Sequence, residues 1–284
     1  RGVLTSFRPP LYPVFLAAIY RLYGIDENRY FRARLAQAFL TAFLAPLTWA
    51  LARRCFPNRE RAARAAAWLV AFYPMFLVYP LALATENLFF VLFLAASLIL
   101  LVVVERLGKF HPDFLAGLAG GVFGLAALTR SIALAPAAIA AWWLWRVTRR
   151  QRMLLAFVVG VAVVTLPWMG RNTLLHHRLM GIESNLGYNL YLGYHPQGTG
   201  TFQYPQSLDL LPILDDGLRD AIGRQKAWEF IRADPWRVPY LVLRRAGHFF
   251  SLEKRALMYF YSNNYFGYIP PFALGSLMLL RIVV

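Results

Sequence analysis

Three charged residues lie at the ends of apolar segments of this chain and could carry out chemistry there. Glu86 is the only carboxylate between Glu60 and Glu105. Arg8 begins the motif Arg-Pro-Pro-Leu-Tyr-Pro, and Arg130 ends the motif Leu-Thr-Arg. A carboxylate can accept a proton from a reacting group, and a guanidinium can bind a phosphate group through two parallel hydrogen bonds. We therefore treat these three residues as candidates for a reaction site.

Each candidate also has an interpretation without chemistry. Thr85 could cap a helix that begins at Glu86, whose carboxylate would then only complement the helix dipole. Arg8 and Arg130 could extend their side chains to lipid headgroups, as arginines at helix ends often do. Both interpretations place the three residues at a membrane surface, because an ionised side chain is costly inside a bilayer. The local sequence leaves this choice open.

The composition is that of an integral membrane protein. Hydrophobic residues make up 59% of the 284 residues, and the mean hydropathy is +0.46. Soluble domains contain only about 45–50% apolar residues. Cys55 is the single cysteine, which excludes an internal disulfide and a cysteine metal cluster. The net charge of +16 comes largely from arginines in short loops, so it indicates topology and contact with anionic lipids, and no nucleic-acid partner is expected.

Runs of roughly 17–25 mostly apolar residues predict helices that span a membrane. The candidates are Phe31–Arg53, Ala62–Pro80, Glu86–Glu105, Phe114–Thr129, Ile132–Trp145, Met153–Gly170 and Phe266–Val284. Arginines gather in alternate loops between these spans, and the positive-inside rule makes those loops cytoplasmic. The turn with Glu86 and the residue Arg130 are therefore expected outside. The same alternation places both ends of the segment Leu11–Tyr23 on the outer side. We therefore predict a short helix there that lies in the outer interface and does not cross the membrane.

We predict an all-α polytopic membrane protein in four parts. These are an outer juxtamembrane segment at 1–30, a six-helix transmembrane bundle at 31–170, an extracytoplasmic loop with amphipathic helices at 171–265, and a truncated seventh transmembrane helix at 266–284. Within the third part we expect a loop at Asn172–Gly200, helices at Leu218–Ala233 and Val238–Leu252, and solvated carboxylates at Asp215, Asp216 and Asp220. The sequence begins without methionine and ends inside an apolar segment, so we expect a fragment lacking both ends.

The order of several motifs resembles a known family. The motifs are Arg8-Pro9-Pro10-Leu11-Tyr12-Pro13, Thr85-Glu86, Leu128-Thr129-Arg130 and Asn185-Leu186-Gly187-Tyr188-Asn189. Each motif is loose by itself, but their order and spacing along nearly the whole chain make the resemblance specific. The sequence is similar to the GT-C membrane glycosyltransferases of the protein O-mannosyltransferase and aminoarabinose-transferase group, which belong to glycosyltransferase family 39 and its relatives. The resemblance implies a GT-C-type bundle with interfacial helices and one long extracytoplasmic loop.

The resemblance also implies an activity and a set of roles. A hexosyl or pentosyl group would pass from a polyprenyl-phosphate donor to a glycan, lipid or protein acceptor at the extracytoplasmic membrane face, in bacteria at the inner (plasma) membrane. Glu86 would be the catalytic residue of the turn, where the family frequently has aspartate. Arg8 and Arg130 would bind the donor phosphate, and the substrate-binding motif of the large loop falls on Asn185, Tyr188 and Asn189. The first acidic residue of the family pattern, expected to be the catalytic base, would precede Arg1.

Some features stay open on the sequence. No metal-ligating residues stand out, and whether a divalent cation is needed is undecided, as is the activity of the fragment alone. A non-catalytic membrane scaffold of envelope glycan assembly is the first alternative, and the absence of a carboxylate in the loop before Arg1 would favour it. A lipid or sugar transporter is the second alternative. A transporter should carry ionisable groups at the middle of its spans, and these spans carry essentially none.

Overall fold

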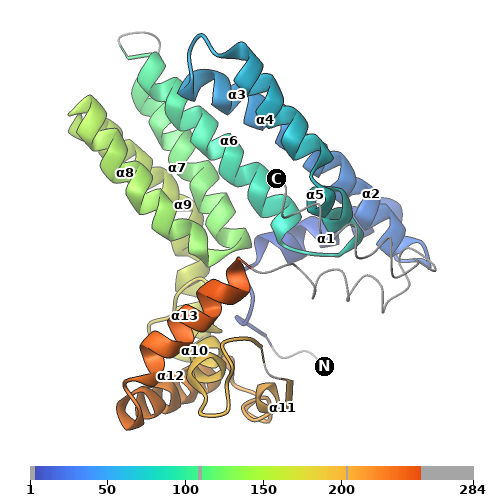
Figure 1. Ribbon diagram of the computed structural model, residues 1–284, viewed down its shortest axis with the longest axis vertical. Helices are drawn as coiled ribbons and strands as arrows, with labels where there is room; N and C mark the ends of the chain where they lie inside the picture. The colour runs from blue at the N-terminus through green and yellow to red at the C-terminus, as the bar shows by residue number, and fades with distance from the viewer. Residues whose placement is uncertain (1–3, 108–110, 203, 251–284) are drawn as a thin grey trace. The chain divides into compact units, whose positions relative to one another are not determined.

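The computed structural model describes residues 4–107, 111–202 and 204–250, and the described residues are helical without a strand. They belong to two compact units, Arg1–Glu183 and Ser184–Val284. Unit 1 contains α1 (Leu11–Tyr23), α2 (Arg29–Ala42), α3 (Leu44–Cys55), α4 (Glu60–Phe72), α5 (Pro74–Val78), η1 (Tyr79–Leu81), α6 (Glu86–Glu105), α7 (Pro112–Thr129), η2 (Ser131–Ala133), α8 (Leu134–Thr148) and α9 (Gln151–His176). Figure 1 shows their arrangement.

The helices of unit 1 confirm the predicted all-α polytopic membrane fold. In the described part of the chain, four helices are long and apolar enough to cross a membrane: α2 with α3, α6, α7 and α9. The helix from Glu60 to Leu81 would be a fifth, although it bends by 48° where α4 meets α5. The predicted span at Ile132–Trp145 corresponds to α8, which has only 15 residues. The predicted seventh span, Phe266–Val284, lies outside the described residues.

The bend between α4 and α5 has a local cause. Tyr73 has an extended backbone, with φ −63° and ψ 117°, and Pro74 begins the next helix. A residue before proline is disfavoured in the helical region, because the proline ring clashes with its backbone. Proline itself suits the first position of a helix, where its missing N–H is not needed. The chain therefore leaves one helix at Tyr73 and starts a shorter one that leads into the turn with Glu86.

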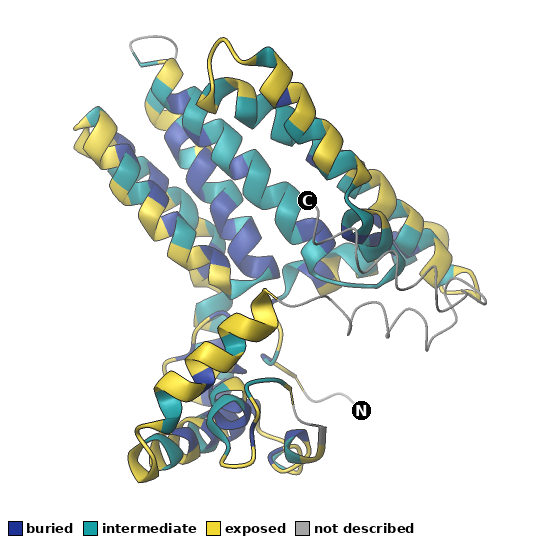
Figure 2. Ribbon diagram, in the orientation of Figure 1, coloured by how far each residue is buried: buried dark blue, intermediate teal, exposed yellow. Residues whose placement is uncertain are grey.

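Glycines bring α7 and α9 into close contact at the centre of unit 1. A Cβ atom on Gly120 would lie 2.0 Å from the carbonyl oxygen of Phe157, and one on Gly160 would lie 2.1 Å from that of Gly117. Small residues allow helix backbones to approach in this way inside a membrane. The ring of Phe157 packs at 5.7 Å from that of Phe123, and Figure 2 shows α7 as the most buried helix of the unit. The two helices form the centre of the unit, and α6 and α8 pack against them.

The basic helix ends lie together at one end of unit 1. The C-terminal ends of α3, α6 and α8 point the same way in Figure 1, and Arg54 of α3 forms an ion pair with Glu105 of α6 at 3.3 Å. The start of α6 and the end of α7 lie at the opposite end, where Glu86 and Arg130 are found. The alternation of basic and non-basic connections in the sequence therefore corresponds to two opposite ends of one bundle.

Unit 2 contains α10 (Leu186–Tyr194), α11 (Tyr204–Ser207), α12 (Asp216–Ala233) and α13 (Arg237–Phe249). The helix predicted at 218–233 is confirmed, and α13 confirms the helix predicted at 238–252 as far as Phe249. The loop predicted for Asn172–Gly200 is wrong in part, because α9 continues to His176 and α10 is helical. Glycine again explains the packing: a Cβ on Gly187 of α10 would lie 1.8 Å from a carbonyl oxygen of α12.

The acidic residues of α12 also correct a prediction. Asp216 and Asp220 were expected in solvent, but both are buried. Asp220 accepts a hydrogen bond of 2.5 Å from the N–H of Gly187 and pairs with Arg224 at 3.0 Å, while Asp216 pairs with Arg219. Buried carboxylates are tolerated when their charges are paired and hydrogen-bonded. The charged residues at the start of α12 are therefore buried, while the apolar side chains of Leu218 and Trp228 are exposed.

Candidate functional site

Glu86 and Arg130 form an ion pair although they are 44 residues apart in the chain. Arg130 follows α7 with an extended backbone, and its Nη1 donates to Oε1 of Glu86, the first residue of α6. The hydroxyl of Thr85 donates to the other carboxylate oxygen at 3.1 Å. The side chains of Glu86 and Arg130 are 27% and 41% exposed. The structure thus joins two residues that the sequence predicted separately, and leaves both accessible to a ligand.

The backbone before Glu86 is held by side-chain amides. Asn87, which is buried, donates from Nδ2 to the carbonyl oxygens of Tyr79, Ala82 and Ala84 at 3.2–3.3 Å. Gln37 of α2 donates from Nε2 to the carbonyl oxygens of Pro80 and Ala82. These carbonyls lie where α5 and η1 end, and the side-chain amides add to the backbone hydrogen bonds that Tyr79, Ala82 and Ala84 already accept. The turn that carries Glu86 is therefore fixed from two sides.

Arg8 lies near this region on a separate segment. It is exposed, and its guanidinium lies 5.4 Å from the centre of the Phe7 ring. Among the described residues, no ion pair joins it to Glu86 or Arg130. Leu11, three positions later, packs with Phe89 of α6 and with the end of α7 in one apolar cluster. The elements that carry the three candidates therefore meet at one cluster, while Arg8 stays outside the ion pair.

The segment before Arg8 is attached to the end of α9. Oγ of Ser6 lies 2.7 Å from Nε2 of His176, and both side chains are buried. Arg171 donates to the carbonyl oxygen of Thr5 at 3.0 Å. His176 therefore has a structural role next to the Arg-Pro-Pro segment. These contacts join residues about 170 positions apart, which no local pattern could indicate.

Tyr12 of α1 is connected to the Glu86 turn through Gln37. It is buried, and its hydroxyl donates to Oε1 of Gln37. Burial raises the pKa of Tyr12 above its usual value, and the nearby Tyr20 and the charge of Glu86 raise it further. The hydroxyl therefore keeps its proton at neutral pH and acts as a hydrogen-bond donor.

A second carboxylate lies beside the ion pair. Glu183 accepts a hydrogen bond from the hydroxyl of Ser131, the residue that follows Arg130, and Ile182 packs against the end of α7. The sequence offered a signal for Glu183 that was not used: it is the only carboxylate between Asp113 and Asp209. The same scarcity singled out Glu86. The Arg130–Ser131 segment is therefore held by a carboxylate on each side.

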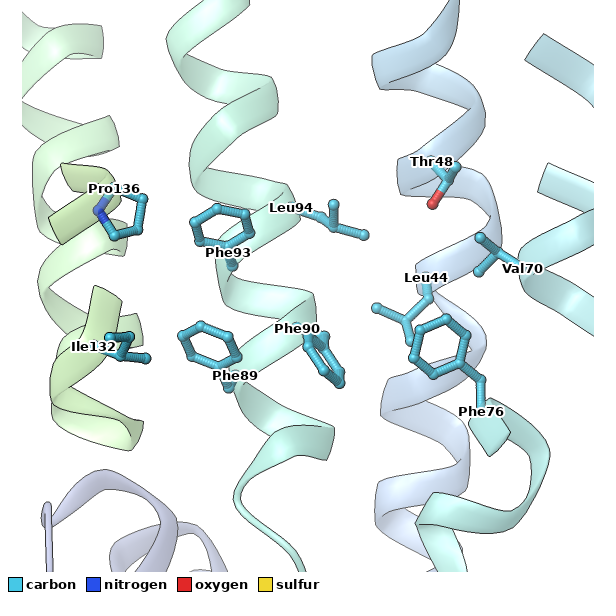
Figure 3. A pocket seen from close by; sticks show the side chains of 10 residues that line it. All are labelled: Leu44, Thr48, Val70, Phe76, Phe89, Phe90, Phe93, Leu94, Ile132 and Pro136. Atoms are coloured by element: carbon cyan, nitrogen blue, oxygen red, sulfur yellow. The ribbon is translucent and has the colours of Figure 1, made fainter. Parts of the chain in front are cut away.

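An apolar cavity of about 500 Å³ begins one helical turn beyond Glu86. In Figure 3, Phe89 and Phe93 of α6 point towards α8, while Phe90 and Leu94 point towards α3. The other lining residues are Leu44, Thr48, Val70, Phe76, Ile132 and Pro136. Thr48 supplies the single polar side chain of this lining, so the cavity suits a hydrocarbon chain. Its lining includes Ile132, two residues after Arg130.

The third group of predicted site residues belongs to unit 2. Asn185 precedes α10 and is buried, and Tyr188 is buried with its hydroxyl donating to the carbonyl oxygen of Ser207 at 2.8 Å. Asn189 is exposed. Asn185 and Tyr188 thus contribute to the packing of α10, and a substrate-binding role for the three residues stays a prediction. No group of three or more histidine, cysteine or acidic side chains that could hold a metal ion is found among the described residues.

Comparisons with curated proteins and with solved structures give no significant match. A family model described as dolichyl-phosphate-mannose-protein mannosyltransferase matches residues 7–169. The matched range includes Arg8, Glu86, Arg130 and the whole apolar cavity, and it ends before the motif at Asn185. It confirms the resemblance to GT-C glycosyltransferases, which use a lipid-linked sugar donor and an acceptor. The chain is an integral membrane glycosyltransferase of the GT-C kind and belongs to the dolichyl-phosphate-mannose-protein mannosyltransferase family.

Proposed function

We propose that the protein transfers a sugar from a polyprenyl-phosphate donor to an acceptor at the extracytoplasmic face of the bacterial inner membrane. The observation that carries the proposal is the Glu86–Arg130 ion pair, whose chain neighbours Phe89 and Ile132 line the apolar cavity. A polyprenyl-phosphate sugar has an anionic head and a hydrocarbon tail. A charged pair next to a hydrocarbon-lined cavity matches both parts.

Arg130 is proposed to bind the donor phosphate. Glycosyl transfer leaves negative charge on the departing phosphate, and a fixed cation nearby stabilises that charge. Arginine suits this role because its planar fork offers two parallel hydrogen bonds to phosphate oxygens. Arg130 already uses Nη1 for Glu86, and its side chain is 41% exposed, so part of the guanidinium is open to a ligand. Arg8, exposed on a neighbouring segment, is the second candidate cation.

The apolar cavity is proposed to hold the first isoprene units of the tail. Ile132 lies two residues after Arg130 and lines the cavity, as does Phe89, three residues after Glu86. A phosphate at Arg130 would therefore place the attached chain against these side chains. Burial of apolar surface contributes about 25 cal/mol per Å². The tail thereby adds affinity for lipid-linked donors over soluble sugar phosphates.

Glu86 is proposed to orient the catalytic base or to position the acceptor. Its carboxylate binds Arg130 and Thr85, so its charge offsets that of the arginine until a phosphate arrives. An acceptor hydroxyl must lose a proton as the new bond forms. The base for that step is proposed to be the first acidic residue of the family pattern. An inverting transfer then needs no covalent intermediate on the protein.

The membrane topology follows from the same proposal. The bundle end with Glu86 faces outwards because the basic helix ends lie at the opposite end, where the positive-inside rule places the cytoplasm. Residues 171–265 are then extracytoplasmic. The exposed apolar side of α13, with Trp236, Leu243 and Phe250 next to Arg244, suits contact with a lipid interface.

The test uses the purified full-length protein and several polyprenyl-phosphate sugars, beginning with dolichyl-phosphate mannose. Released polyprenyl phosphate is measured over time. Arg130→Ala should reduce turnover at least about 100-fold, the usual cost of losing one group that stabilises charge in the transition state. Glu86→Gln should also reduce turnover about 100-fold, as expected when a reacting group is no longer positioned. The matched controls are Glu105→Gln and Arg54→Ala, which break an ion pair at the other end of α6 and should stay near wild type. Near-normal turnover in both site variants would reject the assignment.

A further inference from the structure

Helix α2 contacts two segments that carry candidate site residues. Gln37 lies at the centre of α2 and is fully buried. On one side it accepts the hydroxyl hydrogen of Tyr12, four residues after Arg8. On the other side it donates to the carbonyl oxygens of Pro80 and Ala82, in the turn that leads to Glu86. One amide group thus connects the Arg8 segment with the Glu86 turn.

The hydrogen bonds of Gln37 can be made in only one orientation of its amide. Carbonyl oxygens only accept hydrogen bonds, so the two carbonyls must receive the Nε2 hydrogens. Oε1 is then the only group left for Tyr12, whose hydroxyl is the donor. The amide uses both of its hydrogens and its oxygen in this way. A buried amide whose donors and acceptor are all bonded specifies one arrangement of the segments it joins.

Arg34 and Asn87 strengthen the same connection. Arg34 lies one helical turn before Gln37 and donates from Nε to the carbonyl oxygen of Leu81 at 2.9 Å. With Gln37 it therefore binds the carbonyls of three successive residues, Pro80, Leu81 and Ala82. Asn87 holds the turn from its far side. The turn cannot shift along α2 without breaking several hydrogen bonds at once.

We propose that Gln37 is a positioning residue that sets the separation between Arg8 and Glu86, acting through Tyr12 on one side and through the turn on the other. The inference rests on the proposed function for its catalytic consequence. Arg8 would bind the leaving phosphate, while Glu86 would act near the acceptor, which attacks the same anomeric carbon from the face opposite to the phosphate. Their separation therefore matters most in the transition state, and donor affinity depends on it less.

The first test measures the connection without any activity. Gln37→Met keeps the length of the side chain and removes the hydrogen bonds, and Tyr12→Phe removes only the hydroxyl. Thr165→Val is the matched control, because Thr165 is buried but bonds only within its own helix. Hydrogen exchange is followed in the full-length protein. Gln37→Met should accelerate exchange at least about tenfold in peptides covering both 4–15 and 79–90, and the control should accelerate neither.

The second test measures the catalytic consequence with dolichyl-phosphate mannose or the best donor found. Gln37→Met should lower kcat about 10- to 100-fold with KM for the donor changed less than about threefold, as expected for a small misplacement of reacting groups. Tyr12→Phe should lower kcat in the same way, and the double variant should be no slower than Gln37→Met, because Tyr12 acts through Gln37. A conservative Gln37→Glu variant keeps the acceptor for Tyr12 and should recover exchange protection in peptide 4–15 only.

The outcomes separate the two proposals. If exchange in Gln37→Met increases in the turn but not in peptide 4–15, the connection is wrong. It is also wrong if the effects of Gln37→Met and Tyr12→Phe on kcat simply multiply. Failure of the wild type to use any polyprenyl-phosphate sugar would reject the proposed function, and hydrogen exchange would still decide whether Gln37 links the two segments.

Discussion

Replacing Glu86 by glutamine should tighten the binding of a phosphate group at Arg130 while turnover falls. In the free protein the carboxylate of Glu86 occupies Nη1 of Arg130 and neutralises its charge. An arriving phosphate must share the guanidinium with that carboxylate. Glutamine has nearly the same shape but no charge, so the phosphate would meet an unpaired cation. Few substitutions at a catalytic carboxylate are expected to improve the binding of a product, which makes the sign of the effect informative.

The size of the effect follows from the exposure of the pair. Two unit charges at about 4 Å interact by roughly 4 kcal/mol at an effective dielectric constant of 20. Arg130 is 41% exposed, so solvent screens much of this attraction. Exposed ion pairs contribute about 0.2–1 kcal/mol, and we take the upper end for a partly buried pair. An energy of about 1 kcal/mol corresponds to roughly fivefold tighter binding.

Farnesyl phosphate, a short prenyl phosphate, is a suitable probe for a titration by isothermal calorimetry in detergent. Glu86→Gln should bind it about fivefold more tightly than the wild type, with a stronger dependence on salt. Arg130→Ala should bind it about 10- to 150-fold more weakly, because a hydrogen bond to a charged group contributes about 1.5–3 kcal/mol. Weaker binding by Glu86→Gln, or unchanged binding by Arg130→Ala, would refute the assignment of Arg130 to phosphate.

Three further predictions concern the cavity and the packing. Leu94→Trp should fill the apolar cavity and weaken farnesyl phosphate binding at least about tenfold without changing the binding of inorganic phosphate, which calorimetry can compare. Gly160→Ala should destabilise unit 1 by about 1–3 kcal/mol, since its Cβ would collide with Gly117, whereas Gly170→Ala on the same helix has open space and should be neutral or stabilising in thermal unfolding. Burial lowers the pKa of His195; Asp209 opposes this shift, and Arg237 and Lys226 add to it. The folded protein therefore favours the neutral form of His195. The stability that this preference contributes should be complete above about pH 6.5 and lost as the pH falls through the lower folded-state pKa. Thermal unfolding of wild type and His195→Gln at falling pH would detect this difference.

Elements with strong apolar periodicity were predictable from the sequence. The helices at Leu11–Tyr23 and Glu86–Glu105 have the bounds that the apolar runs indicate. Apolar content together with a proline or an acidic first turn defines such helices locally. The family match confirms the resemblance that the motif order implied. Long, uniform helices therefore follow from local patterns, and the family follows from the order of the motifs along the chain.

The parts that sequence reasoning missed depend on distant partners. The helix α10 lies in a segment rich in Gly, Asn and Tyr, which reads as a loop, and it forms because Gly187 fits closely against Gly223 of α12. Asp220 is buried because the N–H of Gly187, 33 positions away, and Arg224 satisfy its carboxylate. Propensity and hydropathy describe each residue with its neighbours and cannot supply these contacts. The hydrogen bonds that join Tyr12 through Gln37 to the Glu86 turn were missed for the same reason, because their partners are distant in the sequence.

In the candidate site, too, single residues could be selected from the sequence, but their contacts could not. Scarcity of carboxylates singled out Glu86, and the motif order singled out Arg130, but their pairing could be seen only in three dimensions. Glu183 was equally scarce and was passed over, because its contact with Ser131 joins residues 52 positions apart. Both isolated acids contact the Arg130–Ser131 segment, so scarcity of charge in this apolar chain pointed to residues that pair across the fold.

The hydrogen bonds from α2 to the Glu86 turn affect how deep in the membrane this turn can lie. Backbone that leaves a helix normally has to stay where water can solvate its carbonyl groups, because hydrocarbon offers them no donors. Here Arg34 and Gln37 provide those donors from a neighbouring helix. The irregular stretch can therefore lie below the level of bulk solvent, at the depth of lipid phosphate groups, so under the proposed function a lipid-linked donor would reach it without leaving its leaflet.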